Sequence, residues 1–201
     1  MKLHHLLLFL FSALTATLTA QTTEPPLLNN KFSVWSQRLD MSAYIGQKYR
    51  LTVAIRAEPA KRKAAAQAFI RNEPPEGGYQ NWTFMDNMNA RPVRSQEWQT
   101  YTLEGRVEKD APWLGFGFLS LHNGAFYYDD VRLSVEAEPG FWTPLPVPNG
   151  DFENESLDPW QQTSMGIPAR TAGANATIDT TNPFEGKHCL RVENKRGRKT
   201  P

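Results

Sequence analysis

The chain has 201 residues, with 22 Lys or Arg and 21 Asp or Glu, so its formal net charge at pH 7 is +1. Positive and negative residues are interspersed, which leaves no basic surface for nucleic acid and excludes that class of partner. The single cysteine, Cys189, excludes an internal disulfide framework.

Residues 1–20 have the pattern of a secretory signal peptide. Lys2 gives a positive start, an apolar stretch runs from Leu6 to Leu14, and the segment ends at the small residue Ala20. The apolar stretch is shorter than the roughly 20 residues that span a bilayer. We therefore expect cleavage, no membrane span afterwards, and a secreted protein, extracellular or periplasmic. An uncleaved N-terminal anchor is the alternative.

Alternation of apolar and polar residues predicts β-strands along most of the next hundred residues. The segment 49–56 alternates strictly, and 113–121 is apolar on both faces, as expected of a central strand. In the segment 126–136 the alternation predicts that Tyr127, Val131, Leu133 and Val135 are buried and that Phe126 and Tyr128 are exposed. Between these last two strands, Asn123-Gly124 predicts a two-residue hairpin.

The segment 59–69, PAKRKAAAQAF, carries two conflicting signals. Its alanines and its leading proline favour a helix. However, Ala66, Ala68 and Ile70 also alternate with polar or bulky neighbours, which favours a strand. We predict a turn at 61–63 followed by a strand over 64–72.

The character of the sequence changes after Glu136. Four prolines in the segment 138–148, EPGFWTPLPVP, predict an extended linker and not a core element. Another alternating strand follows in the segment 185–194, EGKHCLRVEN.

Two halves of this chain resemble parts of a known module. NGDFE at 149–153, together with EGKHCLRVEN, resembles the opening half of a CenC-type carbohydrate-binding module, which has a galactose-binding-like jelly-roll fold. The segments 36–58 and 98–136 resemble its closing half. FMDNMNARPVRSQEW at 84–98 also resembles the jelly roll that precedes the catalytic domain in secreted bacterial tail-specific peptidases and erythromycin-esterase-like proteins. The resemblance implies an all-β fold, an antiparallel β-sandwich of the jelly-roll type.

The halves stand in reversed order along the chain. We expect a closing half over 27–137, the linker over 138–148, and over 149–201 the opening half of a second, truncated module. Either the chain is a fragment of a longer polypeptide, or the two halves fold together as one circularly permuted jelly roll, since jelly-roll termini lie close together. We favour truncation as the origin, with the halves able to complete each other.

No catalytic motif is present in the sequence. G-x-S-x-G, H-E-x-x-H and phosphate-loop patterns are all missing. His188 and Cys189 are neighbours on a predicted strand, so their side chains point to opposite faces and cannot form a dyad. We expect a chain with no catalytic residues that is not itself an enzyme.

The resemblance implies a structural Ca²⁺ held by acidic residues of the opening and closing strands. The matching positions are Asp151 or Glu153 and Asp129 or Asp130. Asp129 also falls on the predicted buried face, where a carboxylate is costly unless it is paired or binds a metal. The alternative is that Asp129 caps a hairpin or accepts backbone hydrogen bonds.

Aromatic residues in polar loops are the candidates for sugar binding. Tyr79 and Trp82 lie in GGYQNWTF, Trp113 precedes an apolar strand, and Arg91 offers hydrogen bonds to hydroxyl groups. Large aromatic side chains in polar loops have little packing reason to be there. The alternative for Trp113 is a packing role in the sandwich.

We therefore expect a secreted, non-catalytic module of a larger hydrolase that binds a polysaccharide or other glycan. The alternative is a structural spacer or interaction domain preceding a peptidase or esterase catalytic domain that lies beyond this chain. In a third reading the chain belongs to a hydrolase whose catalytic domain follows Pro201.

Overall fold

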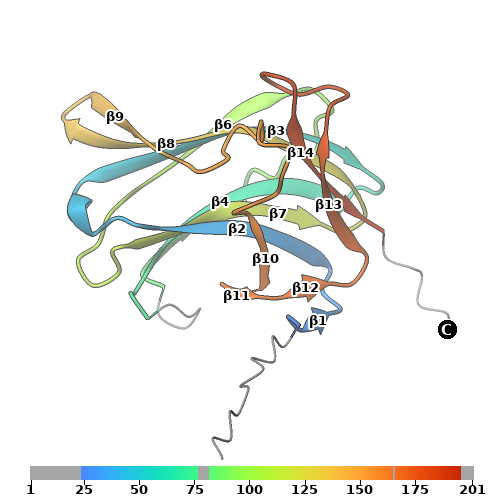
Figure 1. Cartoon of the computed structure of the whole chain (residues 1–201), viewed down its shortest axis with the longest axis horizontal. Helices are drawn as coiled ribbons and strands as arrows, with labels where there is room; N and C mark the ends of the chain where they lie inside the picture. Colours follow the sequence, from blue (N-terminus) through green and yellow to red (C-terminus); the bar gives the residue numbers. More distant parts are fainter. Residues whose placement is uncertain (1–23, 77–81, 165, 196–201) are drawn as a thin grey trace, which may run out of the picture.

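The computed structural model describes residues 24–76, 82–164 and 166–195, and it is an antiparallel β-sandwich. One layer, named the β7 sheet after its central strand, lies below the other, the β8 sheet, in the view of Figure 1. In spatial order the β7 sheet contains β11 (Ile167–Pro168), β10 (Gln161–Ser164), β2 (Phe32–Asp40), β7 (Trp113–Leu121), β4 (Ala65–Glu73) and β5 (Phe84–Asp86). The β8 sheet contains β13 (Ala174–Asp179), β14 (Cys189–Asn194), β8 (Gly124–Glu138), β3 (Lys48–Pro59) and β6 (Gln99–Arg106), with β9 (Phe141–Leu145) also paired to β8. The predicted all-β antiparallel sandwich is confirmed.

Among the described residues, the elements outside the two sheets are short. A parallel pair joins β1 (Leu27–Leu28) to β12 (Arg170–Thr171), and a single 3₁₀ turn, η1, spans Ser42–Tyr44. In the described ranges, no helix is long and apolar enough to cross a membrane.

The two halves of the chain complete one sandwich. Strand β14 pairs with β8 in one sheet, and β10 pairs with β2 in the other, so residues after 149 enter both layers. The Ser33 hydroxyl donates to Asn194 Oδ1 at 2.9 Å, which joins strands from opposite ends of the chain. In the structure the two halves are folded together. The segment 138–148 is also more than a linker, because it contains β9.

The conflicting segment near residue 65 is a strand. β4 spans Ala65–Glu73, and a turn precedes it at 61–63, as predicted. Ala66, Ala68 and Ile70 lie in the core between the sheets, which is the face that the alternation predicts. Tertiary pairing with β7 therefore outweighs the helix propensity of the alanines.

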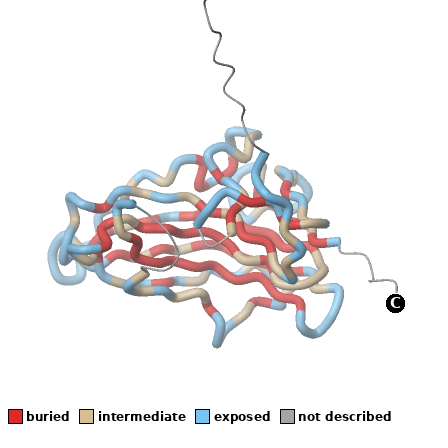
Figure 2. The backbone as a smooth tube through the Cα atoms, turned by 90° about the horizontal axis from the view of Figure 1, so that it is seen from below, coloured by how far each residue is buried: buried red, intermediate tan, exposed pale blue. Residues whose placement is uncertain are grey.

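The core lies between the sheets and is aromatic at its centre. Figure 2 shows the buried residues along the middle of the long strands and the exposed ones in the connections. Phe116 and Phe118 of β7 contact Trp160, whose ring centroid lies 5.9 Å and 4.8 Å from theirs. Phe152 packs on the same indole at 5.7 Å. The second half of the chain thus supplies central core residues to the first.

The prediction for β8 is correct in its second part, but in its first part Tyr127 is buried on the opposite face and Phe126 and Tyr128 are buried, not exposed. Phe126 and Tyr128 lie in the main core, whereas Tyr127 lies on the outer face beside Cys189. The cause is a β-bulge, because the pairing of β3 with β8 shifts between Thr52 and Ala54 and gives β8 an extra residue. Asp130 has a positive φ of 48° at this place. The extra residue reverses the alternation, so that Val131, Leu133 and Val135 are buried as predicted.

The predicted hairpin at Asn123-Gly124 is also wrong. His122 and Asn123 do connect β7 and β8 tightly, but these strands lie in different sheets. The turn is held by His122 N–H donating to Lys31 O and by Ala60 N–H donating to Asn123 O. The Asn-Gly sequence that is typical of a hairpin within one sheet here forms a short connection between the two stacked sheets.

Candidate functional site

The outer face of the β7 sheet carries a cluster of charged residues. Because Ala66, Ala68 and Ile70 of β4 point into the core, Arg71 and Glu73 extend from the opposite face. In the register of the sheet Arg71 lies beside Gly115 of β7, which lies beside Arg38 of β2. A methyl group at Gly115 would clash with the Glu73 carboxylate, so the glycine makes room for the cluster.

Glu73 binds two guanidinium groups at once. Its Oε2 accepts from Arg38 Nε at 2.8 Å, and its Oε1 accepts from Arg71 Nε. The side chains of Arg71 and Glu73 are only 6% and 5% exposed, and that of Arg38 is 33% exposed. Desolvation by burial lowers the pKa of Arg71, although the charge of Glu73 opposes this shift.

Each arginine of the cluster stacks on a tryptophan. The guanidinium carbon of Arg38 lies 4.2 Å from the ring centre of Trp113, and that of Arg71 lies 4.1 Å from the ring centre of Trp82. The order Trp113, Arg38, Glu73, Arg71, Trp82 forms a continuous row, named here the tryptophan–arginine row. Two of the four predicted sugar-binding residues, Trp113 and Trp82, therefore lie at the two ends of one row.

A groove of about 490 Å³ runs beside this row. The hydroxyl groups of Ser36 and Thr163, 2.8 Å apart, lie in its wall next to Gln161. The groove thus offers guanidinium donors and neutral hydrogen-bonding groups together, beside the two tryptophans that stack on its arginines. It is lined by Ser36, Gln37, Arg38, Leu39, Arg71, Glu73, Pro148, Pro159, Gln161, Thr163, Gly166 and Pro168.

Trp82, Trp113 and Arg91 are not among the residues that line this groove. Arg91 forms an ion pair with Asp86 at 2.7 Å and a long hydrogen bond to Thr102 O, between β5 and β6. Tyr79 lies outside the described residues.

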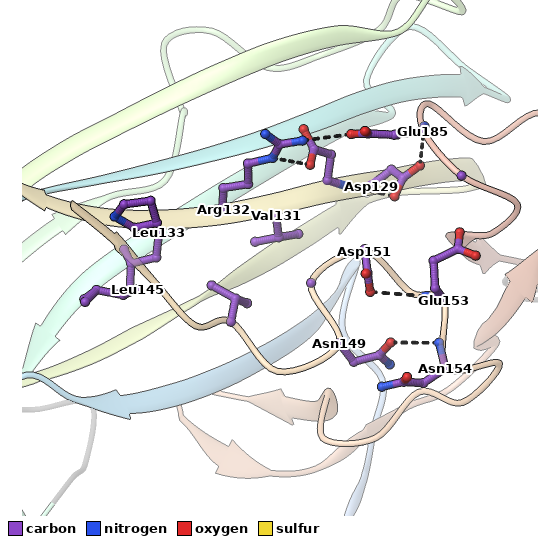
Figure 3. A pocket seen from close by; sticks show the side chains of 15 residues that line it. Asp129, Val131, Arg132, Leu133, Leu145, Asn149, Asp151, Glu153, Asn154 and Glu185 are labelled. Atoms are coloured by element: carbon purple, nitrogen blue, oxygen red, sulfur yellow. Dashed lines mark hydrogen bonds and ion pairs between the residues drawn. The ribbon is translucent and has the colours of Figure 1, made fainter. Parts of the chain in front are cut away.

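The four predicted calcium ligands meet in a second pocket, named here the acidic pocket. Asp129 and Asp130 come from the bulge of β8, and Asp151 and Glu153 come from the loop before β10 (Figure 3). The pocket has a volume of about 730 Å³, and its other wall is apolar and includes Leu145.

Asp129 accepts three backbone hydrogen bonds. Its Oδ1 accepts from Asp130 N–H, and its Oδ2 accepts from the N–H groups of Phe184 and Glu185 at 2.9 and 3.2 Å. Burial raises the pKa of this carboxyl to about 6, although the three donors act in the opposite direction. The backbone-accepting role that the sequence left as an alternative is therefore present.

The other carboxylates of the acidic pocket also have protein partners. Glu153 Oε1 accepts from the N–H groups of Lys187 and His188, which lowers the pKa of Glu153. Asp130 forms an ion pair with Arg132 at 2.5 Å. Among the residues that the structure describes, no group of three or more His, Cys, Asp or Glu is arranged to hold a metal. Calcium at this pocket stays a prediction.

His188 and Cys189 have separate surroundings. His188 Nδ1 lies 3.1 Å from Glu153 Oε2, whereas Cys189 is buried against Ala125 and Tyr127. Burial raises the pKa of the Cys189 thiol to about 12, so it is protonated at neutral pH and is a poor nucleophile.

Sequence reasoning did not select Arg38, Arg71 or Glu73. The signal for two of them was present, because Arg71 and Glu73 follow the apolar alternation of a strand at positions that point away from the core. Nothing in the sequence connects Arg38 to them, since they meet only across β7.

The comparisons with known proteins give only distant neighbours. No known protein family and no curated protein matches this chain. A solved structure described as "CBM4 structure and function" is 18% identical with a TM-score of 0.36, covering 56% of this chain and 66% of that one. The N-terminal CBM22-1-CBM22-2 tandem domain from Paenibacillus barcinonensis Xyn10C is 12% identical with a TM-score of 0.37, covering 77% of this chain and 45% of that one. This chain thus spans less than two thirds of either neighbour, and neither is similar enough to assign a ligand.

Proposed function

We propose that this chain is a non-catalytic carbohydrate-binding module whose ligand lies on the outer face of the β7 sheet. The observation that carries the proposal is the tryptophan–arginine row beside a polar groove. Sugar rings pack their apolar faces on partly exposed indoles, while hydroxyl groups exchange hydrogen bonds with side chains such as Gln161 and Thr163.

The burial of charge in the row supports a binding role. The side chains of Arg71 and Glu73 are nearly inaccessible, although they lie on the outer face of the sheet and not in the core. A buried ion pair contributes little net stability, because desolvation offsets its attraction. Polar groups that converge on a groove are, in contrast, the usual form of a ligand site.

Affinity electrophoresis against a panel of soluble polysaccharides tests the proposal. At least one polysaccharide should retard the protein, and Trp113→Ala and Trp82→Ala should each weaken binding about tenfold or more, as for aromatic anchors in other interfaces. Trp142→Ala is the matched control, because Trp142 also stacks on an arginine, Arg50, at 3.9 Å but lies on the β8 sheet.

Two results would count against the proposal. Binding that Trp113→Ala and Trp142→Ala weaken equally would place the ligand elsewhere. If a broad panel gave no retardation at all, the spacer or interaction domain would become the better description of this chain.

The wider setting of the module rests on the sequence. The signal-peptide pattern of residues 1–20 supports export, and the resemblance to modules of secreted peptidases and esterases supports an accessory role in a larger hydrolase. The mass of the exported protein tests this cleavage. A mass that matches a chain starting at Gln21 would support it, and a mass that includes Met1 would refute it.

A further inference from the structure

The groove beside the tryptophan–arginine row has an excess of positive charge. Among its lining residues the charged ones are Arg38, Arg71 and Glu73, and the remaining nine are neutral. Two guanidinium groups thus share one carboxylate. The whole chain is nearly balanced, with 22 basic and 21 acidic residues, so the excess is a local property of the groove.

Glu73 cannot neutralise both arginines. Each of its oxygens accepts from the Nε of one arginine, so its single negative charge is shared by two guanidinium groups. Arg38 is held further by Nη2, which donates to the carbonyl groups of Pro74 and Pro75 at 2.6 and 3.0 Å. The two guanidinium groups are therefore fixed in position while one positive charge stays uncompensated within the cluster.

The guanidinium of Arg71 reaches the turn between β10 and β11. A Cβ atom at Gly166 would lie 2.6 Å from Arg71 Nη2. Gly166 has a φ of 80°, which favours glycine, and its missing side chain leaves room for the guanidinium.

A buried cation without its own counter-ion is costly. Desolvation of Arg71, whose side chain is 6% exposed, is offset only in part by a carboxylate that it shares with Arg38. An anionic group that enters the groove would supply the missing charge and would accept charge-assisted hydrogen bonds in the geometry that guanidinium favours.

We infer that the ligand of this groove is an acidic glycan, whose carboxylate or sulfate group is bound in the groove against Arg38 and Arg71. The inference rests on the proposed carbohydrate-binding function and adds the chemical class of the sugar. Uronate carboxylates and sulfate esters share the chemistry that the two arginines recognise. Neutral sugar residues of the same glycan would stack on Trp113 and Trp82.

Matched pairs of polysaccharides test the inference, with dissociation constants measured by affinity electrophoresis. Polygalacturonate is compared with highly methyl-esterified pectin, and dextran sulfate with dextran, so that only the charge differs within a pair. We expect the acidic member of at least one pair to bind about tenfold or more tightly than its neutral partner, with the difference falling as salt is added. The pair that responds identifies the anion as carboxylate or sulfate.

Two variants link the preference to the groove. Arg38→Gln should remove most of the preference for the acidic member, whereas Arg50→Gln should leave it unchanged. Arg50 is a close match, because it pairs with Glu104 at 2.6 Å and stacks on Trp142, with a side chain that is 36% exposed. Arg71→Lys keeps the charge and a donor for Glu73 but loses the planar fork, so it should weaken acidic binding without exposing a buried carboxylate.

The outcomes separate this inference from the proposed function. Equal binding of acidic and neutral members that still depends on Trp113 would overturn the inference and leave the carbohydrate-binding function standing. A preference that Arg38→Gln and Arg50→Gln reduce alike would show general electrostatic attraction and would also overturn it. Absence of binding to every member of a broad panel would overturn both. Thermal melting of each variant confirms that it is folded.

Discussion

Trp160 offers the sharpest test of a sandwich completed by both halves of the chain. Its side chain is 2% exposed and packs against Phe116 and Phe118 of the first half. Replacing Trp by Ala in a core costs about 3–5 kcal/mol. Loss of the hydrogen bond from Trp160 Nε1 to Asn149 O, 2.8 Å long, adds roughly 1 kcal/mol. Trp160→Ala should therefore destabilise the whole protein by about 4–6 kcal/mol.

A double-mutant cycle localises the effect. The ring centroids of Trp160 and Phe118 lie 4.8 Å apart, so Trp160→Leu and Phe118→Leu should be coupled by about 0.5–1.5 kcal/mol. Urea unfolding followed by far-UV circular dichroism gives each free energy of unfolding, and the transition should be single because both halves share one core. Phe141→Ala is the control, since Phe141 is 71% exposed and its loss should cost less than about 0.5 kcal/mol.

Additivity would refute the reasoning. If the two leucine substitutions added without coupling, or if Trp160→Ala removed only a minor second transition, residues 149–194 would not share a core with the first half. Purely additive values with a large cost for each variant would indicate that the two rings lie in separate cores.

Three further predictions concern the acidic pocket and the joined strands. The raised pKa of Asp129 means that the folded state holds the proton more tightly than the unfolded state, so the free energy of unfolding should fall by up to about 3 kcal/mol as pH rises from about 4 to about 6. Urea titrations in a chelator should show this fall in the wild type relative to Asp129→Asn; parallel curves would contradict the assignment. If the acidic pocket binds Ca²⁺, chelation should lower the melting temperature of calcium-loaded protein, and an unchanged melting curve would count against the site. Asn194→Ala should cost about 1–3 kcal/mol, because it leaves the buried Ser33 hydroxyl and the Ser120 carbonyl without this partner, and a cost below about 0.5 kcal/mol in urea unfolding would contradict that role.

The strands could be predicted from the sequence because alternation is a local signal. Ala66, Ala68 and Ile70 lie on the face that the alternation indicates. Tyr127 and Tyr128 do not lie on the faces that the alternation indicates, because the register between β3 and β8 shifts just after them, at Asp130. A bulge depends on how two distant strands align, which a single strand does not encode.

The candidate site could be predicted only in part for a similar reason. Trp82 and Trp113 stand out in the sequence as large aromatic residues next to polar segments. Arg38 and Glu73 are 35 residues apart and form an ion pair only because β7 places their strands on either side of it. The resemblance selected four of the five carboxylates that line the acidic pocket and did not select the fifth, Glu185.

The hydrogen bond between Ser33 and Asn194 joins residues that are 161 positions apart. At about 5–20 residues per second, a ribosome needs on the order of 10–30 s to make the chain between them. For most of that time β2 lacks its neighbour β10, and Phe116 and Phe118 lack the indole of Trp160. A growing chain of this kind presents open strand edges and uncovered aromatic rings until its last strand is made, so its nascent form should depend on holding chaperones far more than its finished form does.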